Sequence, residues 1–130
     1  YYIQTLTLHS NVIILGIGIG LLATGLITVN NIRDIEEDKQ NNKNTLIVRF
    51  GTTFGKIEYI SCLLLSSYIL FTHIPYSNTL LFVLIPYSLL IIHNSYKLIT
   101  KTGEILNKVL AQTGILIISY AIILSIAFLI

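Results

Sequence analysis

Four acidic side chains lie within five residues of one short segment, from Asp34 to Asp38. If a helix runs through this segment, Asn30, Asp34 and Asp38 recur at every fourth position and share one helical face. Two carboxylates and a carboxamide in such a row can ligate Mg²⁺, a hard cation that takes oxygen ligands and keeps several waters. A pair of aspartates is only half of a site, so a substrate or another segment must supply further ligands.

Basic side chains follow the aspartates closely and supply the opposite charge. Lys39, Lys43 and Arg49 are candidates for contacting an anionic group held against the metal, and arginine can grip such a group through two parallel hydrogen bonds. Glu37 lies four residues after Arg33, so these two residues are expected to pair along the helix. The segment therefore carries the charges that a metal and an anionic substrate require together.

Two other interpretations of the segment compete with metal binding. A wetted loop beside a membrane accounts for the lysines, because basic residues gather in cytoplasmic loops, but acidic residues contribute little to topology. A calcium loop of the EF-hand type needs glycine at its sixth position, and a loop that begins at Asp34 has Lys39 there. The EF-hand interpretation is therefore excluded.

The whole chain has the composition of a membrane protein. Of its 130 residues 54% are hydrophobic and 11% are charged, and the mean hydropathy is +0.80, whereas soluble domains carry roughly 25% charged residues. Stretches without Asp, Glu, Lys or Arg cover residues 1–32, 59–96 and 109–130, and a spanning helix needs about 20 mostly apolar residues. The expected fold is an all-α, polytopic transmembrane helix bundle with about four spans.

These spans are expected near residues 11–31, 57–74, 77–96 and 109–130, in a single membrane domain over residues 1–130. The Pro-Tyr-Ser-Asn turn at residues 75–78 separates the middle two spans. Four spans put both charged loops, residues 32–56 and 97–108, on one side of the membrane. All 8 Lys and Arg residues lie in these loops, so the positive-inside rule assigns both loops to the cytoplasm.

Glycines in the first apolar run match a known fingerprint by spacing alone. Gly18-x-Gly20-x-x-Ala23 has the pattern of a dinucleotide site, but that fingerprint requires a preceding strand and a helix that begins at the glycines. An apolar run of helical length provides neither. We expect instead a small-residue face that includes Gly16, Gly20, Ala23 and Thr24, against which another helix packs closely.

The segment from Asn30 to Gly51, NNIRDIEEDKQNNKNTLIVRFG, resembles the second aspartate-rich motif of the UbiA superfamily of intramembrane prenyltransferases. Its form, N-N-x-R-D-x-x-x-D followed by K-x-T-L-x-V-R-x-G, is similar to the branch that prenylates 1,4-dihydroxy-2-naphthoate in menaquinone biosynthesis. The preceding YYIQT and GLLAT are similar to that branch as well. One position departs from the pattern: a glycine usual before the motif's lysine is Asn42 here, and asparagine can take the same positive φ at modest cost.

The resemblance implies a larger bundle of nine spans, of which this chain is the C-terminal portion. Two aspartate-rich motifs, one from each half, then hold Mg²⁺ around a prenyl diphosphate at the cytoplasmic end of a central cavity. The second motif falls on Asn30, Asp34 and Asp38, and the charged positions around it fall on Arg33, Lys39, Lys43 and Arg49. The first motif is not in this sequence, which also has no methionine. The missing N-terminal half is therefore an expected partner, and this chain alone is expected to be inactive.

The implied reaction transfers a polyprenyl group from prenyl diphosphate to 1,4-dihydroxy-2-naphthoate with decarboxylation, giving demethylmenaquinone. Asp34 and Asp38 are the implied catalytic Mg²⁺ ligands, supported by Asn30. The resemblance also implies a multi-pass protein of the bacterial inner membrane, which contacts membrane lipid and no nucleic acid. Another aromatic acceptor, such as 4-hydroxybenzoate, is the alternative within the superfamily. A non-enzymatic membrane subunit, a transporter fragment and a stand-alone four-helix protein with a wet loop are the alternatives outside it.

Overall fold

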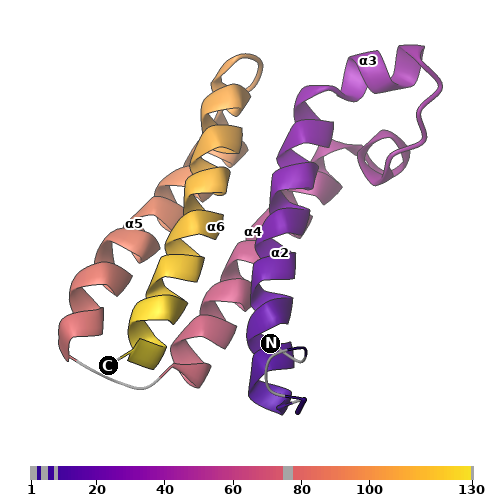
Figure 1. Ribbon diagram of the computed structural model, residues 1–130. Helices are drawn as coiled ribbons and strands as arrows, with labels where there is room; N and C mark the ends of the chain where they lie inside the picture. Colours follow the sequence, from indigo (N-terminus) through magenta and orange to yellow (C-terminus); the bar gives the residue numbers. More distant parts are fainter. Residues whose placement is uncertain (1–2, 4–5, 8, 75–77, 130) are drawn as a thin grey trace.

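The computed structural model describes residues 3, 6–7, 9–74 and 78–129, and these residues form helices and connections without a strand (Figure 1). The four long helices are α2 (Ser10–Arg33), α4 (Leu46–His73), α5 (Asn78–Thr100) and α6 (Ile105–Leu129). A short helix, α3 (Ile35–Gln40), follows α2 directly and runs in a different direction (Figure 1). The predicted all-α bundle is confirmed.

Each long helix contains a segment that is long and apolar enough to cross a membrane. These segments are Ser10–Arg33, Leu46–His73, Leu81–Thr100 and Ile105–Phe128. The first has 24 residues, and at a rise of 1.5 Å per residue it extends ~36 Å, more than the ~30 Å of a bilayer's hydrocarbon core. Large apolar side chains such as Leu64 and Phe82 are exposed on the outside of the bundle, as lipid-facing surfaces require.

Helix α2 lies at the centre of the packing, because it contacts both α4 and α6, whereas α5 packs mainly on α6. The core between these helices is apolar and includes Leu22, Leu63 and Leu116, all fully buried. Gly18 lets α6 approach closely, since a methyl group added there would overlap the hydroxyl of Tyr120. Helix α2 thus packs against both α4 and α6, and its C-terminal end lies near the α5–α6 connection.

The glycines that pack are not the ones expected from the sequence. Gly18 and Gly25 face neighbouring helices, whereas a methyl group added at Gly16 or Gly20 would meet nothing within 4 Å. The prediction that Gly16 and Gly20 contact another helix is wrong for the helices that the structure describes. Gly18 and Gly25 are two helical turns apart, and the period of 3.6 residues puts them on the other side of α2. The run does lie inside a helix, so the exclusion of a dinucleotide fingerprint is confirmed.

Most of the segment expected as a loop over residues 32–56 is helical. Thr45 caps the N-terminus of α4 by accepting a hydrogen bond from the Val48 N–H at 3.2 Å. Helix α4 is kinked at Gly51, where φ is 85° and ψ is 170°, a region that essentially only glycine occupies. The second expected loop shrinks to the few residues between α5 and α6. Residues 75–77 of the expected turn lie outside the described residues.

All of these charged segments lie at the same end of the bundle. The end of α2, helix α3, the start of α4 and the α5–α6 connection meet there, while the chain termini lie toward the opposite end (Figure 1). The arrangement brings residues far apart in the sequence within reach of the aspartates.

Candidate functional site

The three candidate ligands lie along one helical path that bends in the middle. The Asp34 N–H donates to the Asn30 carbonyl at 3.0 Å, and the Asp38 N–H donates to the Asp34 carbonyl at 2.8 Å. Asp34 itself has φ −96° and ψ 11° and separates α2 from α3. The helical repeat therefore continues through the bend, and Asn30, Asp34 and Asp38 stay one turn apart.

One guanidinium joins two of these three side chains. Arg33 Nε donates to Asp34 Oδ1 at 2.6 Å, and Nη2 donates to Asp34 Oδ2 at 2.7 Å. Nη2 also donates to Asn30 Oδ1 at 2.8 Å. The predicted pair of Arg33 with Glu37 is wrong, because the guanidinium takes the two-point contact with the adjacent carboxylate. Glu37 remains exposed on α3.

Helix α6 holds the same guanidinium from another direction. Arg33 Nη1 donates to Asn107 Oδ1 at 3.0 Å, across 74 residues of sequence. Asn107 lies in the first turn of α6, which begins at Ile105. The Arg33–Asn107 hydrogen bond therefore connects the C-terminal end of α2 to the first turn of α6.

Arg33 also fixes the charge of Asp34. Its hydrogen bonds lower the pKa of Asp34 below the ordinary value of 3.8; partial burial opposes this, and the charges of Arg33 and Lys43 add to the lowering. Asp34 is therefore ionised at neutral pH, which is the form that a metal ligand requires.

Asp38 is the most buried acid of the segment, with a side chain 6% exposed. Its Oδ1 accepts a hydrogen bond from Lys43 Nζ at 3.0 Å, and its carbonyl accepts the Lys43 N–H at 2.8 Å. Asn42, which precedes Lys43 in the sequence, has φ 53°. The expectation that this asparagine takes the positive φ of the usual glycine is confirmed. The second carboxylate oxygen, Oδ2, is buried and has no hydrogen-bond partner.

These residues fit half of a divalent cation site. A buried carboxylate oxygen without a partner costs free energy, so Asp38 Oδ2 favours a cation or a donor beside it. No group of three or more His, Cys, Asp or Glu side chains that could hold a metal occurs within the described ranges. A cation bound to Asp34 and Asp38 would therefore need ligands from elsewhere, such as the oxygens of a diphosphate.

The two remaining candidate cations are on the surface near this end. Lys39 Nζ lies 2.9 Å from Glu36 Oε1, and both side chains are largely exposed. Arg49 is exposed in the first turn of α4. Lys43 contacts a motif aspartate directly. The diphosphate roles of Lys39, Lys43 and Arg49 all stay predictions.

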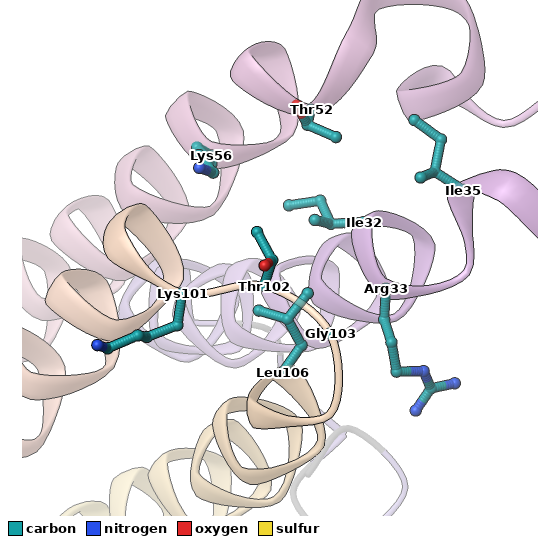
Figure 2. Close-up of a pocket in the computed structure, with 9 residues that line it drawn as sticks. All are labelled: Ile32, Arg33, Ile35, Thr52, Lys56, Lys101, Thr102, Gly103 and Leu106. Carbon is teal, nitrogen blue, oxygen red and sulfur yellow. The ribbon is translucent and has the colours of Figure 1, made fainter.

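A cavity of about 230 Å³ opens next to this site, between the end of α2, α4 and the α5–α6 connection. Ile32, Arg33 and Leu106 are among the residues that line it, and the guanidinium end of Arg33 points away from the other two side chains (Figure 2). Lys56, another lining residue, donates to the Ile99 carbonyl at 3.0 Å. The guanidinium of Arg33 is directed toward Asp34 instead.

Two polar contacts of this region were not foreseen from the sequence. One is the Asn107 contact, which no local pattern marks because its partner is in another helix. The other is the hydrogen bond from Thr28 Oγ1 to Glu58 Oε2, 2.8 Å long, between α2 and α4. Glu58 carries a usable signal, since an ionisable residue within a membrane span requires a partner.

Comparison with known proteins agrees with the motif. Residues 1–113 match the UbiA prenyltransferase family. The chain is 36% identical over 137 aligned residues to a 1,4-dihydroxy-2-naphthoate octaprenyltransferase of Haemophilus influenzae, with all of this chain and 43% of that protein aligned. A protein of the same name from Escherichia coli is 43% identical over 67 residues, 52% of this chain and 21% of that protein.

No solved structure gives a significant match. The chain spans less than half the length of the curated relatives it matches. The match over residues 1–113 confirms the resemblance found in the aspartate-rich segment, and the chain belongs to the UbiA prenyltransferase family.

Proposed function

We propose that this chain forms the C-terminal part of an aromatic prenyltransferase. The complete enzyme would transfer a polyprenyl group from prenyl diphosphate to 1,4-dihydroxy-2-naphthoate. Family membership and the names of the two relatives support the reaction class and the acceptor. The observation that carries the proposal is the Asn30–Asp34–Asp38 path at the charged end of an apolar bundle, with Asp38 Oδ2 buried and unpartnered.

The reaction requires stabilisation of the negative charge that develops on the diphosphate leaving group. When the allylic C–O bond breaks, its electron pair leaves with the diphosphate, so cations beside the diphosphate stabilise the transition state more than the ground state. Mg²⁺ held by Asp34 and Asp38, with Asn30 supporting, would neutralise that charge. Lys43, together with Lys39 and Arg49, would hold the diphosphate oxygens by charge-assisted hydrogen bonds.

The aromatic acceptor completes the reaction by forming a carbon–carbon bond. The electron-rich ring carbon of dihydroxynaphthoate forms the new bond to the allylic carbon, and the carboxylate leaves as carbon dioxide. The product is demethylmenaquinone in its reduced form. The prenyl tail would lie among the spans, because each buried CH₂ contributes about 0.8 kcal/mol to partitioning from water.

The distribution of Lys and Arg indicates on which side of the membrane the site lies. All 8 Lys and Arg residues lie in the segments at the charged end of the bundle, so the positive-inside rule favours a cytoplasmic location for that end. We propose a multi-pass protein of the bacterial inner membrane. The N-terminal half of the same enzyme would supply the second aspartate-rich motif.

Prenyl transfer by the complete protein in membranes tests the proposal. The assay compares dihydroxynaphthoate with 4-hydroxybenzoate, with and without Mg²⁺. We expect Mg²⁺-dependent product from dihydroxynaphthoate, its loss in Asp34→Asn, and its retention in Glu37→Gln, a matched removal of an exposed carboxylate. Product from 4-hydroxybenzoate alone would change the acceptor, and wild-type turnover by Asp34→Asn would contradict the role of Asp34.

A further inference from the structure

The guanidinium of Arg33 lies between the side chains of Asn30 and Asp34, two of the proposed metal ligands. Three oxygens, Asn30 Oδ1 and both carboxylate oxygens of Asp34, accept hydrogen bonds of 2.6 to 2.8 Å from this single cationic group. These are the same side chains that the site offers to a divalent cation. A protein cation and a metal ion therefore have one ligand set in common.

Asp38 differs from these two side chains. Its contact with Lys43 uses only Oδ1, and its Oδ2 is buried without a partner. The site thus has one oxygen open to a cation and three that are already engaged by Arg33. An incoming cation would meet Asp38 first, and the contact with Asp34 would require the arginine to give way.

Asn107 keeps the arginine in this position. Arg33 Nη1 donates to Asn107 Oδ1 at 3.0 Å, on the edge of the guanidinium that does not touch Asp34. Figure 2 shows the guanidinium end of Arg33 pointing away from the side chains of Ile32 and Leu106. This contact holds the guanidinium beside Asn30 and Asp34, so it favours the position in which Arg33 engages their oxygens.

We propose that Arg33 is an internal counter-cation that competes with the divalent metal for Asn30 and Asp34, and that Asn107 is the residue that positions it. The inference rests on the proposed metal site. A metal ion bound to these oxygens would lie close to the guanidinium, and two cations at that separation repel each other. Loading of the site therefore displaces Arg33 from Asp34 and disrupts its contact with Asn107.

Metal binding without substrate tests this competition. The complete protein, in lipid nanodiscs, is titrated with Mn²⁺ alone, and free Mn²⁺ is followed by electron paramagnetic resonance. The proteins compared are the wild type, Arg33→Gln and Asn107→Ala. Lys108→Gln is the matched control, because it removes one positive charge from the exposed position next to Asn107.

We expect Arg33→Gln to bind Mn²⁺ about fivefold or more tightly than the wild type, as removal of a competing charge-assisted contact predicts. Asn107→Ala should shift the affinity in the same direction by less, and Lys108→Gln should leave it unchanged. Unchanged or weaker binding by Arg33→Gln would overturn the proposal, because Arg33 would then only orient the Asp34 carboxylate. If Arg33→Gln does not fold, Asn107→Ala decides alone: wild-type affinity would overturn the proposal.

The competition and the proposed reaction fail in different ways. Absence of Mn²⁺ binding by the wild type and by both variants would overturn the competition, because no cation would then displace Arg33 from Asp34. Prenyl transfer by the wild type is measured separately, so a protein that transfers prenyl groups but shows no gain in Arg33→Gln retains its function and loses only the competition.

Discussion

Arg33 and Asp34 are neighbours in the sequence and still form a two-point ion pair, with Nε to Oδ1 at 2.6 Å and Nη2 to Oδ2 at 2.7 Å. The two side chains are 29% and 24% exposed, so solvent screens part of their attraction. The main effect of the pair is to fix the charge and direction of Asp34 at the point where α2 ends. The behaviour of the site with pH follows from this contact.

Acidification should break the pair only below the ordinary pKa of aspartate. Since hydrogen bonding to Arg33 lowers the pKa of Asp34 from 3.8, its contribution to folding is complete above that value and is lost as pH falls through the lower folded-state value. The ¹³C shift of the Asp34 carboxyl measures this pKa directly. Arg33→Gln should raise it, and a wild-type Asp34 that titrates at or above 3.8 would contradict the pairing.

A side chain at the kink in α4 should destabilise the protein. Gly51 has φ 85° and ψ 170°, and a residue with a Cβ in that region costs about 1–3 kcal/mol. Gly51→Ala is therefore expected to lower the free energy of unfolding by about that amount, measured by denaturant titration in mild detergent. Gly114→Ala is the control, because the nearest atom to its added methyl group is 4.0 Å away. Equal stability of the two variants would contradict the kink.

The hydrogen bond between Tyr59 and Thr113 should couple α4 to α6. The two hydroxyl oxygens are 2.8 Å apart, and both residues are fully buried. Interhelical hydrogen bonds in membranes contribute about 0.6 kcal/mol on average and up to about 1.7 kcal/mol. A double-mutant cycle with Tyr59→Phe and Thr113→Val should give a coupling free energy in that range. Additive effects of the two changes would show that the contact does not stabilise the bundle.

The fold was predictable because its signals are local. Apolar runs of spanning length predicted the long helices, and turn chemistry predicted the positive φ of Asn42. Contacts between helices were not predictable in the same way. The choice of Gly18 over Gly16 as a packing position depends on how α2 is rotated, and the Arg33–Asn107 contact depends on where α6 begins. The error over Glu37 has a local origin, since Arg33 makes its two-point contact with the adjacent Asp34 carboxylate instead.

Binding of prenyl diphosphate to the complete protein tests the central claim most directly. Affinity is measured with and without Mg²⁺ for the wild type, for the double variant Asp34→Asn/Asp38→Asn, and for Glu36→Gln/Glu37→Gln, which removes the same charge from exposed positions of α3. The account predicts Mg²⁺-dependent binding by the wild type and the control, and a loss of about a hundredfold in the aspartate variant. Equal Mg²⁺-dependent affinity in all three proteins would contradict the assignment of the site.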